Sequence, residues 1–299
     1  MKQNGLKAWI LAARPKTLTG AIAPVIVGGA LAYRMCGYEP ERLLPFVLCL
    51  LFAVFMQIDA NLVNDYFDWK KGSDRDDRLG PERACAQGWI TPKAMKWGIA
   101  TMTILSCLVG LPLIAYGGWW LIGIGALCVV FCFLYTTRFS YLGLGDLLVI
   151  IFFGIVPVGF TYYVLTGEWT WQLMLIAFAQ GLVTDTLLIV NNYRDIDQDR
   201  ASGKKTVIVR FGRNFGLYFY LACGEIGTGI VGFTLLGCYF CRLWTFFIII
   251  YLALHTATFI KMTMCTGRQL NRILGSTARN IFIFSLTTAL ALFTCRFFG

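Results

Sequence analysis

Two short acidic segments contain the residues with the clearest potential for chemistry. The first reads Asn64-Asp65-Tyr66-Phe67-Asp68, followed by Asp74, and the second reads Asn191-Asn192-Tyr193-Arg194-Asp195, followed by Asp199. Each lies at the end of a long apolar run, where a carboxylate is costly unless a cation accompanies it. Lys and Arg residues follow both segments, among them Lys71, Lys204 and Lys205, and could donate to phosphate oxygens. This combination predicts a divalent cation that carries a phosphorylated ligand, because Mg²⁺ combines a few carboxylates with phosphate oxygens.

The two segments repeat the pattern Asn-[Asp/Asn]-Tyr-x-Asp, in which Asp68 aligns with Asp195. An even number of predicted spans separates the copies, so both should face the same side of the membrane. On helices that continue from the apolar runs, the polar residues of each copy share one face, which should line a cavity rather than meet lipid. Two such faces can bind one diphosphate between them. Asp59 and Asp185 lie deeper in the same runs and are further candidates for the cavity lining.

The composition is that of an integral membrane protein. Hydrophobic residues make up 58% of the chain, charged residues 14%, and the mean hydropathy is +0.67. Soluble domains carry about 25% charged residues, so a soluble enzyme with aspartate-rich motifs is excluded. The net charge of +10 needs no nucleic-acid partner, because loops on the cytoplasmic side of membrane proteins are rich in Lys and Arg.

Hydropathy predicts an all-α, polytopic membrane protein whose nine transmembrane helices form a bundle around a central cavity, as one domain over residues 1–299. The predicted spans are 17–34, 44–63, 94–115, 119–135, 146–165, 171–190, 215–237, 243–263 and 279–297. With a cytoplasmic N-terminus, all but four of the 26 Lys and Arg residues fall on the inner side. The positive-inside rule therefore places the N-terminus and both acidic segments in the cytoplasm and the C-terminus outside.

Four stretches resemble the UbiA-type superfamily of intramembrane aromatic prenyltransferases, and most closely its branch that uses 1,4-dihydroxy-2-naphthoate. They are Ala13–Leu18, Asn64–Asp74 with Asp77–Pro81, Tyr135-Thr136 with Gly143–Asp146 and Phe152–Gly154, and Asn191–Asp199 with Gly203–Thr206. The resemblance follows the same order along nearly the whole chain. The last three spans contribute almost nothing to it.

The resemblance implies transfer of a polyprenyl group from its diphosphate to the aromatic acid, with loss of CO₂ and diphosphate, to give demethylmenaquinone. It implies Mg²⁺ as cofactor and the bacterial inner membrane as location, with lipid and the two substrates as partners and no obligate protein partner. The implied metal ligands are Asp65, Asp68, Asp74, Asp195 and Asp199. The implied diphosphate-binding residues are Asn64, Arg83, Asn191, Asn192, Arg194 and Lys205. Asp65, Asp68, Asp195, Asp199 and Lys205 are accordingly the catalytic candidates.

Two alternatives remain at this point. A relative with another acceptor, such as 4-hydroxybenzoate or homogentisate, would share both motifs. A cation-coupled transporter would also place carboxylates within the membrane. A transporter site is expected near the middle of the bilayer, whereas these clusters end their helices beside Lys and Arg, which favours an anionic diphosphate.

Overall fold

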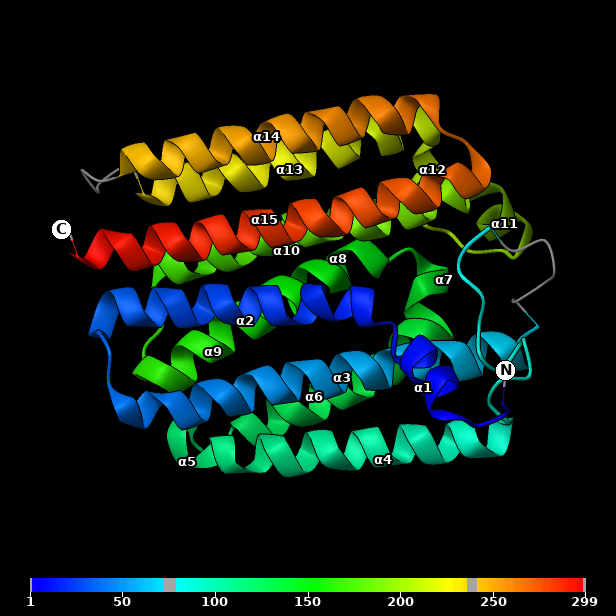
Figure 1. The fold of residues 1–299 in the computed structure, drawn as a ribbon, viewed down its shortest axis with the longest axis horizontal. Coiled ribbons are helices and arrows are strands. Elements are labelled where there is room, and N and C mark those ends of the chain that lie inside the picture. The colour runs from blue at the N-terminus through cyan, green and yellow to red at the C-terminus, as the bar shows by residue number, and fades with distance from the viewer. Residues whose placement is uncertain (1, 73–78, 236–240, 298–299) are drawn as a thin grey trace.

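The computed structural model describes residues 2–72, 79–235 and 241–297, and every regular element in these ranges is helical (Figure 1). Eight helical stretches are long and apolar enough to cross a bilayer, and a shorter apolar stretch, Ile248–Met264, joins them. Together they match the nine predicted spans. The helices run alongside one another, with α1 and the end of α15 at opposite ends of the bundle, as an odd number of crossings requires (Figure 1).

The crossing helices are α2 (Pro15–Cys36), α3 (Leu43–Lys70), α4 (Pro92–Gly110), α6 (Leu121–Leu134), α9 (Val156–Thr166), α10 (Trp171–Arg194), α13 (Arg213–Leu235), α14 (Cys241–Met264) and α15 (Leu270–Phe297). Short elements extend or connect them: α1 (Leu6–Ala13), η1 (Pro40–Arg42), η2 (Leu111–Leu113), α5 (Ile114–Gly117), η3 (Tyr135–Phe139), α7 (Ser140–Leu142), α8 (Gly145–Ile150), η4 (Ile151–Ile155), α11 (Ile196–Ala201), α12 (Val207–Phe211) and η5 (Gly267–Gln269). Of these, η3 and η4 are single turns of π-helix.

A break at Arg14 separates α1, which hydropathy did not predict, from α2. Arg14 has φ 51° and ψ 69°, in the left-handed region, and Pro15 begins the next helix. Proline suits the first position of a helix but disfavours the α-helical conformation in the residue before it. The chain therefore turns at Arg14, and α1 packs against α3 at the same end of the bundle as the acidic segments.

Two helices extend beyond their predicted spans by about two turns. α3 continues to Lys70 and so carries the whole of the first acidic segment from Asn64 to Asp68. α15 begins at Leu270 rather than at residue 279, because its first turns contain polar residues that a hydropathy window rejects. Asn271, one of these residues, contacts the second acidic segment, as described below.

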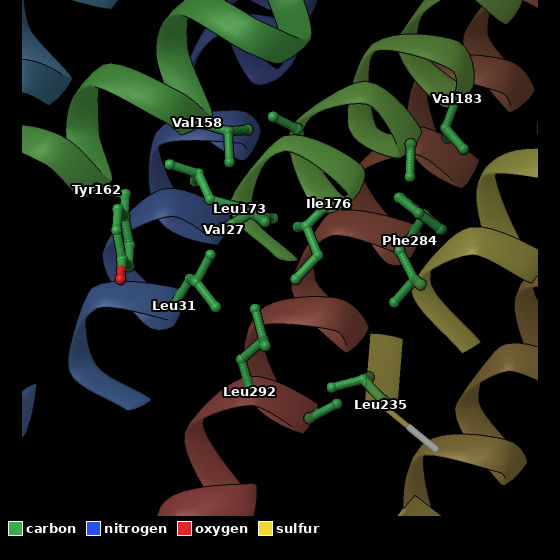
Figure 2. Close-up of a cluster of buried hydrophobic side chains, with 14 of the residues drawn as sticks. Val27, Leu31, Val158, Tyr162, Leu173, Ile176, Val183, Leu235, Phe284 and Leu292 are labelled. Carbon is green, nitrogen blue, oxygen red and sulfur yellow. The ribbon is translucent and has the colours of Figure 1, made fainter. Parts of the chain in front are cut away.

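The largest core cluster forms where α2, α9, α10 and α15 meet (Figure 2). Val27, Val158, Ile176 and Leu292 pack there and are almost fully buried. Glycine permits a close approach of α2 and α9, because a β-carbon on Gly28 would lie 2.6 Å from the backbone oxygen of Val158. Small residues at such contacts allow membrane helices to pack closely. This core holds α10 in a fixed position beside α2.

Candidate active site

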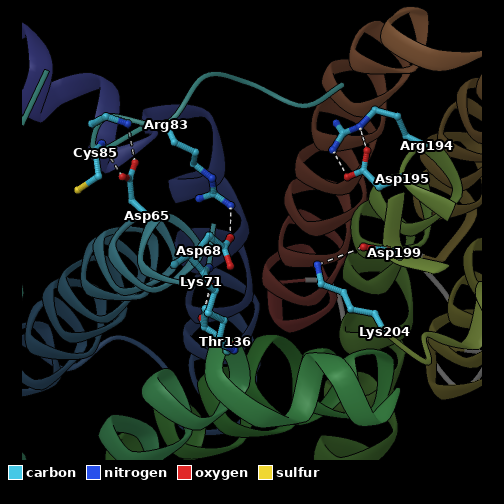
Figure 3. Close-up of polar contacts among 12 residues, drawn as sticks. Asp65, Asp68, Lys71, Arg83, Cys85, Thr136, Arg194, Asp195, Asp199 and Lys204 are labelled. Carbon is cyan, nitrogen blue, oxygen red and sulfur yellow. Dashed lines mark hydrogen bonds and ion pairs between the residues drawn. The ribbon is translucent and has the colours of Figure 1, made fainter. Parts of the chain in front are cut away.

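The end of α3 presents two carboxylates with different surroundings (Figure 3). Both oxygens of Asp65 accept backbone N–H groups, from Ala84 and Cys85, at 2.8 Å each. One turn later, Asp68 accepts a hydrogen bond from Arg83 Nη2 at 2.9 Å. Asp65 therefore anchors the loop that carries Arg83, and Arg83 pairs with the carboxylate nearest the helix end.

The end of α10 carries a second ion pair. Arg194 Nε and Nη2 donate to the two oxygens of Asp195 at 2.7 and 2.6 Å. Arg194 Nη1 also donates to Oδ1 of Asn271 on α15 at 2.7 Å. The amide nitrogen of Asn271 in turn donates to the backbone oxygen of Leu79 at 2.8 Å. The last helix thus holds Arg194 in place and joins it to the loop that follows the first segment.

A third pair joins Asp199 of α11 to Lys204, whose Nζ lies 3.1 Å from Asp199 Oδ1. Burial raises the pKa of Asp199 above its usual value, and the nearby Lys204 opposes that shift. Burial alone would lower the pKa of Lys204, but the carboxylates of Asp199 and Asp68 together raise it above its usual value. Lys204 is thus near carboxylates from both acidic segments, and the two segments face each other (Figure 3).

Tyr141 provides independent evidence that the segments are close together. Lys71, which follows the first segment, lies over the Tyr141 ring at 4.3 Å from its centroid, and Lys204 lies 5.8 Å from the same centroid. Lys71 Nζ also donates to the backbone oxygens of Thr136 and Thr137 at 3.3 and 3.0 Å. Both oxygens belong to the π-helical turn η3, so this lysine fixes an irregular stretch of backbone beside the site.

A cavity of about 530 Å³ lies within the bundle, and its lining includes Asn64 and Asn191, the equivalent asparagines of the two segments. Asn64 Oδ1 also contacts the Thr136 hydroxyl. Away from the asparagines the walls are mostly apolar, as they are in pockets that bind small organic molecules. The polar groups are therefore concentrated at one end of an apolar chamber.

The repeated sequence pattern occupies equivalent positions in the fold. Tyr66 and Tyr193, the central residues of the two copies, are both buried. Each lies under a cationic group near the start of the next crossing helix. Lys96 of α4 lies 5.7 Å from the Tyr66 centroid, and the Arg213 guanidinium of α13 lies 5.4 Å from that of Tyr193. The prediction that both copies lie at the same end of the bundle is confirmed.

Several predicted residues lie elsewhere. The Lys205 side chain is exposed, and its backbone N–H donates to the Tyr141 oxygen at 3.1 Å, so Lys204 and not Lys205 points at the acidic groups. Asn192 is buried next to Asn191, but Asn191 is the one that lines the cavity. Asp74 lies outside the described residues.

The prediction that Asp59 and Asp185 line the cavity is wrong. Both side chains are fully buried between helices. Asp59 accepts a hydrogen bond from Thr103 of α4 at 2.7 Å, and Asp185 is close enough to Asp146 of α8 to interact with it electrostatically. Their sequence neighbours Ala60 and Thr184 line the cavity instead.

Lys71 and Lys204 belong to the basic residues that follow the two segments and that the sequence predicted as phosphate donors. Tyr141 and Asn271 were not predicted as parts of this site. The resemblance favoured Lys205 over its neighbour Lys204 as the lysine that binds diphosphate. No sequence signal marks Asn271, which lies outside both acidic segments.

The donors at the site suit a hard divalent cation. Asp68, Asp195 and Asp199 supply carboxylate oxygens, and Mg²⁺ requires only one or two carboxylates when phosphate oxygens complete its shell. Within the described ranges, no three acidic, histidine or cysteine side chains converge on one point. Each of the three carboxylates instead pairs with Arg or Lys, a group that also binds phosphate.

An all-helical membrane bundle with two paired acidic motifs over an apolar chamber is the architecture of an intramembrane transferase. The sequence model of the UbiA prenyltransferase family matches residues 21–294, and the chain belongs to that family. Family membership supports the prenyltransferase interpretation over the transporter alternative.

Relatives and solved structures agree with this assignment. The chain is 39% identical over 229 residues to 1,4-dihydroxy-2-naphthoate octaprenyltransferase of Haemophilus influenzae, covering 74% of each chain. It is 40% identical over 215 residues to the enzyme of the same name from Escherichia coli, covering 69% of each. A UbiA homolog from Aeropyrum pernix has the same fold, with a TM-score of 0.71, 14% identity and coverage of 92% of this chain and 97% of that one. A UbiA homolog from Archaeoglobus fulgidus, bound to GPP and Mg²⁺, gives a TM-score of 0.64 at 18% identity, covering 96% and 99%.

Proposed function

We propose that this protein transfers a polyprenyl group from polyprenyl diphosphate to 1,4-dihydroxy-2-naphthoate, a reaction of menaquinone biosynthesis. The observation that carries the proposal is that three carboxylate–cation pairs lie on or just after the two segments whose asparagines, Asn64 and Asn191, line one apolar cavity. The relatives named for this naphthoate reaction favour it over 4-hydroxybenzoate or homogentisate as acceptor.

In this reaction Arg83, Arg194 and Lys204 bind the diphosphate, because charge-assisted hydrogen bonds to phosphate are strong. Asp68, Asp195 and Asp199 would hold Mg²⁺, which supplies electrostatic stabilisation of the leaving diphosphate when bound. Asp65 has both oxygens on backbone amides, so we assign it the positioning of Arg83 rather than direct metal ligation. Asn64 and Asn191 orient the diphosphate where it enters the cavity.

The bond changes balance without a further reactant. The carbon–oxygen bond of the prenyl diphosphate breaks, and its electron pair leaves with diphosphate. The ring carbon that bears the carboxylate forms the new carbon–carbon bond. The bond to the carboxylate then breaks, its electrons restore the aromatic ring, and CO₂ leaves. The apolar walls keep water away from the allylic cation.

The proposal includes an inner-membrane location, with the N-terminus and the acidic segments in the cytoplasm, where both charged substrates would reach the site. The multiple apolar helices establish an integral membrane protein. The distribution of Lys and Arg supports this orientation. Cysteine labelling of engineered residues at the two ends of the bundle tests it: a residue near Lys2 should be protected from an impermeant reagent in intact cells.

The decisive test uses the purified protein in lipid nanodiscs with a prenyl diphosphate, Mg²⁺ and one aromatic acid at a time. With carboxyl-labelled 1,4-dihydroxy-2-naphthoate we expect labelled CO₂ and a prenylated product without the carboxylate. Asp68→Asn protein is the matched control and should form neither. Product formation only from 4-hydroxybenzoate or homogentisate would replace the acceptor and keep the reaction class, and no product from any acid would refute the proposal.

A further inference from the structure

Two glycines line the cavity and leave space unfilled. Gly20 is a buried residue of α2, and Gly125 belongs to α6. Apart from the nearby backbone of its own helix, a β-carbon on either glycine would meet no atom of the described residues within 4 Å. Gly28 contrasts with them, because a β-carbon there would lie 2.6 Å from the Val158 backbone oxygen. Gly28 thus serves helix packing, whereas Gly20 and Gly125 widen the cavity.

The two glycines lie at different depths. The contact between Asn64 and Thr136 places these residues of α3 and η3 at the same depth in the bundle. Asn61 donates to Thr17 at 2.9 Å, so these residues of α3 and α2 share a second depth. Asn61 is three residues before Asn64 on α3, and Gly20 is three residues after Thr17 on α2. At a rise of 1.5 Å per residue, Gly20 therefore lies roughly 9 Å deeper than Asn64. Gly125 is eleven positions before Thr136, so by the same rise it lies roughly 16 Å deeper than Thr136 and Asn64. Gly20 is therefore near the acidic mouth, and Gly125 is deeper.

The walls differ between these depths. Near Gly20 the lining includes the polar residues Gln57 and Asn61, and Gln57 Nε2 donates to Asn61 Oδ1 at 3.4 Å. Around Gly125 it includes Leu121, Ile124 and Cys128, which are apolar. A hydroxylated aromatic acid suits the first environment because it needs polar partners beside an apolar ring face. An isoprenoid tail suits the second.

We infer that Gly20 and Gly125 are specificity-determining residues for different substrates. Gly20 leaves room for the second ring of a bicyclic aromatic acid, and Gly125 leaves room for isoprene units beyond the first few. The inference rests on the proposed function. It adds an assignment of the aromatic acid and the isoprenoid tail to different depths of the cavity. A cavity of about 530 Å³ is in the range that binds one drug-sized molecule, so space at each depth is limiting.

Leucine substitutions test this division. The variants are Gly20→Leu, Gly125→Leu and, as matched control, Gly123→Leu. Gly123 lies on α6 two residues from Gly125, is exposed, and would likewise place a β-carbon in open space. Replacing a helical glycine removes a conformational-entropy cost, so all three proteins should remain folded. Thermal unfolding in detergent verifies this for each variant.

The measurements are the KM for 1,4-dihydroxy-2-naphthoate and the kcat/KM for geranyl, farnesyl and geranylgeranyl diphosphate. Filling the space at either glycine with a leucine side chain should weaken binding by about fivefold to 150-fold, which corresponds to about 1–3 kcal/mol. Gly20→Leu should raise the acceptor KM by about tenfold and leave the order of preference among the three donors unchanged. Gly125→Leu should lower kcat/KM for geranylgeranyl diphosphate far more than for geranyl diphosphate and leave the acceptor KM unchanged. Gly123→Leu should match the wild type.

The inference is overturned if Gly20→Leu leaves the acceptor KM unchanged, if both cavity variants affect both substrates alike, or if Gly123→Leu has the same effect. A binding measurement separates this result from failure of the proposed reaction. Thermal stabilisation of the protein by naphthoate alone and by geranylgeranyl diphosphate alone does not require turnover. Gly20→Leu should lose only the first and Gly125→Leu only the second. Wild-type protein that neither ligand stabilises would overturn the inference as well.

Discussion

Lys71 and Lys204 lie over the same aromatic ring, that of Tyr141, although one follows the first acidic segment and the other the second. Lys71 is held by two carbonyl groups of η3, and Lys204 pairs with Asp199. Tyr141 of α7 therefore lies between the two motifs and contacts a lysine that follows each of them.

Lys204 should matter for donor binding, whereas Lys205 should not. Lys204→Ala removes a charge-assisted contact worth about 1.5–3 kcal/mol, so kcat/KM for the prenyl diphosphate should fall about tenfold to hundredfold. Lys205→Ala is the matched control, because that side chain is exposed. Steady-state kinetics with varied donor measure both. Equal losses in the two variants would contradict the assignment of Lys204.

Substitution of Asp65 should mainly lower stability, whereas substitution of Asp68 should mainly lower activity. Asp65→Ala leaves two buried N–H groups, of Ala84 and Cys85, without their acceptor, and should lower the free energy of unfolding by about 2 kcal/mol or more. Asp65→Asn keeps one acceptor oxygen and should fall between Ala and wild type. Asp68→Asn keeps an acceptor for the buried Arg83, so it should leave the unfolding temperature close to that of the wild type and reduce kcat by at least about hundredfold. Thermal unfolding and activity assays in the same detergent decide this.

Asn271 should support the site from the last helix. Asn271→Ala removes both the acceptor for Arg194 and the donor to Leu79, so Arg194 loses its orientation. We expect a rise of about tenfold in KM for the prenyl diphosphate, from the loss of a hydrogen bond to a charged group. Arg272→Ala, at the next position of α15, is the control. A wild-type KM in Asn271→Ala would show that Arg194 needs no such support.

Removal of divalent cations should stop turnover. EDTA treatment is expected to abolish prenyl transfer, and added Mg²⁺ should restore it, because the carboxylates of Asp68, Asp195 and Asp199 would otherwise repel the diphosphate. The thermal stabilisation that geranyl diphosphate gives measures whether the metal-free protein still binds the donor. Full activity after exhaustive chelation would contradict a metal-dependent mechanism.

The amino-acid sequence by itself determined the class of protein. Apolar runs of membrane-spanning length fixed the all-helical fold, and the bias of Lys and Arg predicted the orientation of the chain. The repeated Asn-[Asp/Asn]-Tyr-x-Asp pattern located both halves of the site, because acidic residues at the ends of membrane helices are costly and therefore informative.

Only the tertiary structure decided which of these residues face one another. Asp65 and Asp68 are one helical turn apart, yet one binds backbone amides and the other pairs with Arg83. Lys204 and Lys205 are neighbours, yet only Lys204 points toward Asp199. Asn271 reaches Arg194 from a distant part of the chain. Such choices depend on the packing of helices far apart in sequence, and a local pattern of residue types contains no information about that packing.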